Sequence, residues 1–438
     1  MTELCFIRDG WIDGSLEDAD ERASFTRLKI TADKAVLTRA FSKRGGGETE
    51  ALNLPLLPLA SYIAKTWWPL LYEPPRQSRD EAFPARHRLD LPMHGYVFPA
   101  LAVCSAGDDA VLVDWASLEN EHSPLKLLTS SPREPLQISR DSIEPMLMDV
   151  VESVLARLSS NSRAHQELVD NWERVKESLD SPGQTAYCMA AGRLGIDPYD
   201  PEATDISVLA EDLPDKLFSD ISDAIVVSRL AQTTNWTRDV KGRLELCPTI
   251  DVAAFGPRPK DDLKVTAGEI GFRAAVDLRA RLDLGLENPK RAVVDLLGAA
   301  ARRDSALAEE GPAAMTGLIH RTNGVAHIGT VARSARQQHF RACAAAYIAW
   351  SSEPGDVRAG TVALTRRQQA SRAFAAEMVA PRHYLYERAG RAGFNAEDLQ
   401  EEAGRLVAPY ETVMWQAWRG GVSLWDLELP TSRRSFFF

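Results

Sequence analysis

The chain has 438 residues, 45% of them hydrophobic and 26% charged, a composition that predicts a globular protein of two or three domains with an ample core. Its formal net charge of −11 disfavours non-specific binding to nucleic acids or anionic membranes. The five cysteines form no C-x-x-C pair and no apolar run is long enough to cross a bilayer, so we expect a cytoplasmic protein with no membrane contact, disulfide scaffold or thiolate zinc site.

Residues 1–135 predict a β-rich domain with one helix. Four segments have strand composition: 28–31, 35–38, 95–103 and 110–115. The last two flank a short polar stretch, which indicates a hairpin. Leu59, Ile63 and Trp67 recur every four residues, so we expect a helix with its tryptophan side chains in the core. Residues 74–92 are rich in proline, arginine and aspartate, and predict a long loop.

The periodicity becomes helical from residue 142 and predicts a helical region over 142–245. Pro214 is expected to divide the apolar stripe near the end of this region into two short helices. Three prolines mark 247–266 as a linker. From residue 267 the order is helix, helix, hairpin, helix, helix, followed by a helical extension and tail over 391–438. This order predicts an α+β fold class.

Two alanine-rich helices are expected at 335–350 and 366–381. The second ends in F-A-A-E-M-V-A-P, a sequence that stops at Pro381. This stretch, together with the preceding helices and hairpin, resembles the ImmA/IrrE family of compact zinc peptidases over 267–390. The resemblance implies a zincin-like helical domain with a small sheet. It also implies a first helix that carries H-E-x-x-H, in which two histidines bind zinc and the glutamate takes a proton from the bound water.

That metal-binding motif is degenerate in this chain. When the family pattern is aligned on Phe340, the first histidine position falls on Ala344, the glutamate position on Ala345 and the second histidine position on Ile348. The acidic ligand of the second helix falls on Gln368. These side chains can neither hold zinc nor act as a base. The resemblance therefore implies a peptidase-like scaffold without catalytic residues, metal or cofactor.

The former cleft remains a candidate binding site for a protein partner or a small ligand. Polar and aromatic residues of the two helices are expected to line it: Arg336, Arg341, Tyr347, Trp350, Gln368, Gln369 and Arg372. Members of the ImmA/IrrE family are often partners of transcriptional repressors. The resemblance implies a regulatory protein in a stress, mobile-element or toxin–antitoxin-like setting.

Two other functions remain open at this point. An active metallopeptidase is possible if ligands are recruited elsewhere, and the candidates are His327, His339, His383 and Glu377. A nucleic-acid-associated regulator is possible because residues 331–390 contain nine arginines. The terminal Phe436–Phe438 is a further candidate contact with a partner or with the chain's own surface.

Overall fold

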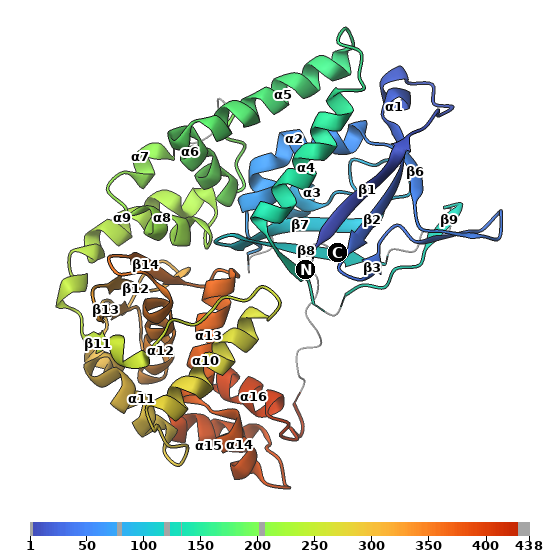
Figure 1. Ribbon diagram of the computed structural model, residues 1–438. Helices are drawn as coiled ribbons and strands as arrows, with labels where there is room; N and C mark the ends of the chain where they lie inside the picture. The colour runs from blue at the N-terminus through green and yellow to red at the C-terminus, as the bar shows by residue number, and fades with distance from the viewer. Residues whose placement is uncertain (1–2, 77–80, 118–122, 133, 201–205, 428–438) are drawn as a thin grey trace. The chain divides into compact units, whose positions relative to one another are not determined.

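The computed structural model describes residues 3–76, 81–117, 123–132, 134–200 and 206–427 (Figure 1). Helices account for 48% of the chain and strands for 18%, with the strands in small antiparallel sheets, which confirms the predicted α+β class. None of the described helices is long and apolar enough to cross a membrane. The terminal phenylalanines considered above lie outside the described residues.

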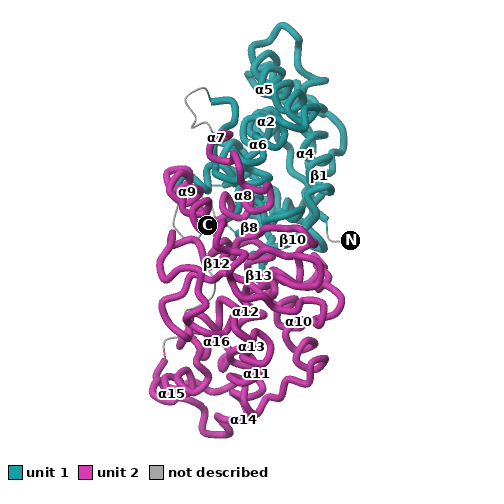
Figure 2. Tube along the Cα trace, turned by 90° about the vertical axis from the view of Figure 1, so that its left-hand side faces the viewer, with its two compact units in different colours: residues 1–206, 434–438 teal, residues 207–433 magenta. Residues whose placement is uncertain are grey.

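The chain divides into two compact units, which meet in sequence between Ile206 and Ser207 (Figure 2). This boundary falls inside the helical region expected over 142–245. The buried apolar residues form a separate cluster in each unit. Each unit therefore has its own hydrophobic core, and each is described by itself below.

The first unit contains small antiparallel sheets. In one, β2 (Phe25–Ala32) pairs with the other strands: β1 (Leu4–Trp11), β3 (Ala35–Val36) and β6 (Leu52–Pro55). A second sheet joins short strands: β4 (Ala40–Ser42), β5 (Glu48–Thr49) and β9 (Leu125–Leu127). The third contains the predicted hairpin and one more strand: β7 (Ala100–Gly107), β8 (Ala110–Ala116) and β10 (Leu136–Ser139). The sequence placed the start of β7 too early, because residues 95–99 form turns and irregular chain.

The described helices of this unit are α1 (Ala19–Ala23), α2 (Leu57–Tyr72), α3 (Phe83–His87), α4 (Arg140–Leu155), α5 (Arg163–Asp180) and α6 (Pro182–Arg193). Helix α2 packs on β7 and α4 packs on β1 and β10, while α5 and α6 pack on α2. The predicted helix is α2, and Trp67 lies in the core as expected, with its ring centroid 5.2 Å from that of Trp172 on α5 in an edge-to-face arrangement. The short helix α3 interrupts the segment that was predicted as one long loop.

The second unit begins with helices on either side of Pro214, as predicted: α7 (Ser207–Ala210), α8 (Asp215–Ser222) and α9 (Leu230–Lys241). Short 3-10 turns occur at Val227–Arg229, Leu244–Leu246 (η2), Ala253–Phe255, Gly298–Ala301 and Arg303–Ser305. The sheet has the order β11-β13-β12-β14 and is antiparallel throughout, with strands β11 (Thr249–Asp251), β12 (Met315–Arg321), β13 (Val325–Thr330) and β14 (Val357–Thr361). The predicted hairpin is β12–β13.

Helices pack on this sheet and on one another: α10 (Ala267–Arg281), α11 (Pro289–Leu297), α12 (Ala335–Ser351), α13 (Arg366–Val379), α14 (Arg382–Ala389), α15 (Ala396–Leu406) and α16 (Tyr410–Arg419). Helix α12 packs on β12 and β13, and α13 packs along both α10 and α12. A Cβ atom added at Gly271 of α10 would collide with the Ala370 carbonyl oxygen of α13. Small residues therefore let these helices approach closely.

Candidate functional site

The positions on α12 that the sequence resemblance aligned with a zincin motif lie in the interior of the second unit. Ala344, Ala345 and Ile348 on α12 are 8%, 3% and 1% exposed. They belong to one apolar core together with residues of α10, α13 and the sheet. Alanine is a strong helix former and its small side chain allows close packing. In place of the histidines and glutamate, α12 thus presents an apolar packing surface.

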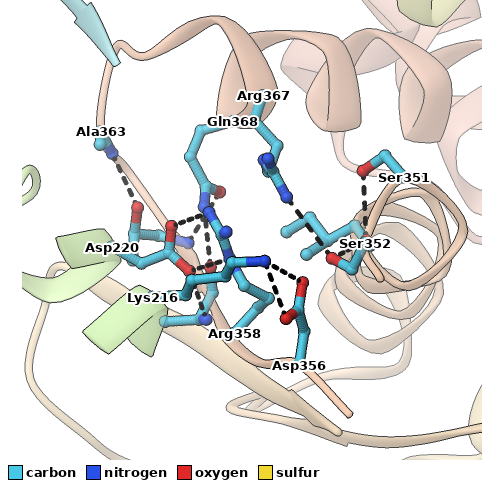
Figure 3. A network of polar contacts seen from close by, with 12 residues as sticks. Lys216, Asp220, Ser351, Ser352, Asp356, Arg358, Ala363, Arg367 and Gln368 are labelled. Carbon is cyan, nitrogen blue, oxygen red and sulfur yellow. Dashed lines mark hydrogen bonds and ion pairs between the residues drawn. The ribbon is translucent and has the colours of Figure 1, made fainter. Parts of the chain in front are cut away.

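Gln368 on α13 is also buried, but both ends of its amide are hydrogen-bonded (Figure 3). Its Nε2 donates to the Ala359 carbonyl oxygen at 2.7 Å, and its Oε1 accepts from the Thr361 N–H at 3.0 Å. Both partners are main-chain groups of β14. Gln368, at the position that the resemblance assigned to an acidic ligand, therefore hydrogen-bonds to the main chain at the edge of the sheet.

Two other side chains complete this edge of β14. The Ala359 N–H donates to Asp220 Oδ2 at 2.9 Å, and the Thr361 carbonyl accepts from Arg372 Nη1 at 3.2 Å. Strand β14 is the last strand of its sheet, so these main-chain groups have no neighbouring strand. Buried backbone groups need hydrogen-bond partners. Side chains from α8 and α13 supply them here.

Asp220 also forms an ion pair with Arg358, as Figure 3 shows. The Arg358 Nε and Nη2 atoms lie 2.8 Å and 2.6 Å from the two carboxylate oxygens, and both side chains are more than nine-tenths buried. Lys216, one turn earlier on α8, contacts Asp356 at 2.9 Å near the surface. This network was not predicted from the sequence, because Asp220 and Arg358 are far apart along the chain.

The aromatic residues expected to line a cleft are packed inside the second unit. Tyr347 and Trp350 are 4% and 3% exposed, and their ring centroids lie 5.4 Å and 6.3 Å from that of Phe374. Trp350 Nε1 donates to the Gly256 carbonyl at 3.1 Å. Burial raises the pKa of the Tyr347 hydroxyl well above its usual range. Both rings hold helices together and face no open surface.

The four remaining predicted binding residues are half-buried. Arg341 donates to the Val331 carbonyl, Gln369 Nε2 donates to the Leu364 carbonyl at 2.5 Å, and Arg372 Nη2 donates to the Ala363 carbonyl at 2.8 Å. Arg336 lies beside α15, with its Nη2 3.7 Å from where a Cβ of Gly404 would stand. The structure thus separates the seven predicted residues into three buried side chains and four half-buried ones.

Two of the nine arginines between 331 and 390 are buried, Arg358 and Arg366, and the other seven are half-buried or exposed. Arg366 is 3% exposed and pairs with Asp261 at 2.5 Å, and Arg388 lies 3.1 Å from Glu402. Arg341, Arg358 and Arg372 bind the groups described above. Guanidinium groups suit such roles because they donate several hydrogen bonds in a fixed geometry. Part of the arginine content of this segment therefore serves internal contacts, whereas Arg333 and Arg388 are exposed.

The four candidates for a relocated metal site are dispersed. His327 lies on β13, His339 is buried on α12, and His383 on α14 pairs with Glu387 at 3.1 Å. Burial, and secondarily Lys290, lowers the pKa of His339, whose Nδ1 has no hydrogen-bond partner among the described residues. Within the same described ranges, no group of three or more His, Cys, Asp or Glu is arranged to hold a metal ion.

Glu377, the acid of F-A-A-E, is buried and only 4% exposed. Burial raises its pKa to about 7, despite a hydrogen bond from the Arg382 N–H and another from Gln416 Nε2 at 2.7 Å. Arg279 of α10 donates to the neighbouring Met378 carbonyl at 2.5 Å. These contacts join α13 to α10, α14 and α16.

A buried carboxylate of the first unit, Glu73, was not anticipated from the sequence. Glu73 is fully buried at the end of α2, 2.7 Å from Arg86, 2.9 Å from Arg76 and 3.1 Å from His87. Burial alone would raise its pKa, but hydrogen bonds from His87 and Arg86 lower it to about 2. His87 Nδ1 also contacts the Val103 carbonyl at 2.8 Å, so this cluster fixes α3 to β7.

Comparison of the chain with protein-family models, with curated proteins and with solved structures gives no match.

Proposed function

We propose that this protein is a non-catalytic, peptidase-like regulatory or binding protein that resembles the ImmA/IrrE family. One observation carries the proposal. The positions of the two histidines, the glutamate and the acidic ligand are occupied by Ala344, Ala345, Ile348 and Gln368, which are buried in packing or bonded to β14. Alanine and isoleucine side chains have no atom that can bind zinc or accept a proton.

The scaffold around these positions supports a role that depends on shape. Helices α12 and α13 pack against each other, and α12 packs on the sheet, although neither helix has metal ligands or a general base at the aligned positions. A protein partner or small ligand would contact the half-buried polar side chains of α12 and α13, Arg336, Arg341, Gln369 and Arg372. The resemblance favours a partner in a stress, mobile-element or toxin–antitoxin-like response.

The alternative functions have less support. A nucleic-acid-binding surface requires exposed cations, whereas Arg358 and Arg366 are buried beside carboxylates. A relocated peptidase site would need ligands that converge on one ion. His339 and His383 lie on α12 and α14 and share no bonded partner with His327 among the described residues.

A peptidase assay on the full chain tests the proposal. Purified protein would be incubated with unfolded casein, with added zinc chloride and with a chelator. We expect no cleavage above that of a buffer control under either condition. Cleavage that the chelator stops, and that His327→Ala or His339→Ala removes, would show instead that the protein is a metallopeptidase with relocated ligands. A mobility assay at low salt would test nucleic-acid binding, and we expect no retardation.

A further inference from the structure

The sheet of the first unit that joins β5, β4 and β9 has two faces of different character. Ala40 on β4 lies opposite Thr49 on β5 and opposite Leu127 on β9. Ala40 is fully buried, and Leu127 packs against the hydrophobic core of this unit. Successive side chains of a strand point to opposite faces of its sheet. The face that contains Phe41, the next residue of β4, therefore points away from the core.

Phe41 lies at the centre of this outer face. Its partners in the register are Glu48 on β5 and Lys126 on β9. Leu128 comes two residues after Lys126, and its N–H donates to the Arg39 carbonyl at 2.8 Å. Leu128 is thus the diagonal neighbour of Phe41, a position within reach of an aromatic side chain. Both side chains belong to residues that are 38% exposed, so this face presents a small apolar patch to solvent.

Cations surround the apolar patch. Arg39 and Lys43 lie two residues before and two residues after the phenylalanine, and both are exposed, as is Lys126 on β9. Arg44, in the turn that follows β4, is exposed as well. Arg39 binds Glu48 through Nε at 3.1 Å and through Nη2 at 2.6 Å. Cations therefore outnumber carboxylates among the described residues of this face and turn, in a chain whose net charge is −11.

The turn after β4 leaves open space beside these cations. Ser42 holds the turn, because its Oγ accepts from the Gly45 N–H at 3.0 Å and its carbonyl accepts from the Gly46 N–H at 3.0 Å. A Cβ atom added at Gly46 or Gly47 would have no other atom within 4 Å. A partner can therefore approach the basic turn and the apolar patch together.

Charge complementarity indicates the kind of partner. Exposed cations around an apolar patch match a protein segment in which carboxylates alternate with apolar side chains. Single-stranded nucleic acid matches this face less well, because its bases stack on several aromatic side chains. Among the described residues of the three strands Phe41 is the only aromatic one, and the Glu48 carboxylate beside it would repel phosphates.

We propose that the outer face of the β5–β4–β9 sheet binds an acidic, partly apolar segment of a partner protein. Phe41 and Leu128 contact the apolar side chains of that segment, and the basic side chains of the face and turn contact its carboxylates. This surface belongs to the first unit. It is therefore additional to the contacts proposed for α12 and α13 and independent of them.

Fluorescence anisotropy of a labelled peptide mixed with the full chain tests this surface. The probe is an octapeptide of alternating glutamate and leucine, and an octapeptide of alternating lysine and leucine is the control. We expect only the acidic peptide to bind, and we expect added sodium chloride to weaken its binding. Phe41→Ser and Lys126→Glu should each weaken binding about tenfold.

Ile7→Ser and Lys176→Glu are the matched control variants, because Ile7 on β1 is 47% exposed and Lys176 on α5 is exposed. We expect both to bind the acidic peptide as the wild type does. Thermal unfolding shows whether each variant is folded, and Lys126→Glu decides the question if Phe41→Ser is not. The proposal is overturned if the acidic peptide binds no better than the basic one, or if the control variants weaken binding equally. Tighter binding of single-stranded oligothymidine, lost in Lys126→Glu, would overturn it in favour of a nucleic-acid surface.

Discussion

At the scale of single residues, the second unit buries charged side chains that differ in how well their partners compensate them. Arg358 and Asp220 form a close ion pair, whereas Glu377 has fewer close partners for its negative charge. The difference appears in their environment, since Glu377 has Gln416 and the Arg382 N–H as hydrogen donors and no close guanidinium contact shorter than 3.9 Å. Desolvation then dominates and favours the protonated carboxyl group.

Glu377 should make the stability of the protein depend on pH. Its pKa is about 7 in the folded chain and 4.5 ordinarily, so the folded state holds this proton more tightly. The stabilisation is complete below pH 4.5 and is lost as the pH rises to about 7, a loss of about 3 kcal/mol. We expect Glu377→Gln to flatten the decline of unfolding free energy between pH 5 and pH 8, measured by urea unfolding.

Other groups of the protein also titrate between pH 5 and pH 8. The quantity to compare is therefore the difference in unfolding free energy between Glu377→Gln and wild type at each pH. Arg279 of α10 and Arg382 of α14 act on Glu377, and Arg419 of α16 and Glu269 of α10 act on Arg382. They remain in both proteins. Parallel pH profiles for wild type and Glu377→Gln would contradict the raised pKa.

At the scale of elements, the edge of β14 depends on α8. Asp220 is the only α8 carboxylate that binds both Arg358 and the Ala359 N–H within the described chain. The contact links a helix near residue 220 to a strand near residue 360. Asp220 and Arg358 are both buried, so the contribution of this ion pair to stability depends more on its geometry than on its charges alone.

Removal of this buried carboxylate should be costly. In Asp220→Ala the Arg358 guanidinium loses its carboxylate partner inside the protein, and we expect a loss of about 3–5 kcal/mol in unfolding free energy. The matched control is Lys216→Ala on the same helix, because Lys216 is 51% exposed and its pair with Asp356 lies near solvent. We expect that variant to lose less than about 1 kcal/mol. Similar losses in the two variants would contradict the assigned role of Asp220.

At the scale of the whole molecule, the chain has two hydrophobic cores with no shared residue. The tryptophan pair Trp67 and Trp172 lies in the first, and α12 and α13 supply much of the second. Each core is formed by residues on one side of the boundary between Ile206 and Ser207. A cavity in one core should therefore destabilise its own unit first.

Trp172→Ala tests this division, because it removes a fully buried indole from the first unit. We expect a loss of about 3–5 kcal/mol there, seen as faster hydrogen exchange in α2, α4 and α5. Peptides from α12 and α13 should keep their wild-type exchange rates. Trp418→Ala on α16 is the control, since that side chain is 47% exposed. Equal acceleration of exchange in both units after Trp172→Ala would show that they unfold together.

The amino-acid sequence by itself determined the local structure. Periodic apolar residues predicted α2 and α4, alanine-rich composition predicted α12 and α13, and turn residues predicted the β7–β8 and β12–β13 hairpins. These elements depend on neighbours a few residues apart. The absence of ligands at Ala344, Ala345, Ile348 and Gln368 was equally visible in the sequence. The inference from arginine content to a basic surface failed for the buried arginines, since composition does not show which carbonyl or carboxylate a side chain will meet.

Only the tertiary structure decided how the side chains are used. It placed Tyr347 and Trp350 in the core and gave Gln368 the role of closing the edge of β14. It also brought Glu245 to His320 and His327, across 75 residues of sequence in one case. Such contacts join segments that are distant along the chain, and their geometry follows from the packing of whole helices and strands. Local sequence patterns do not determine that packing.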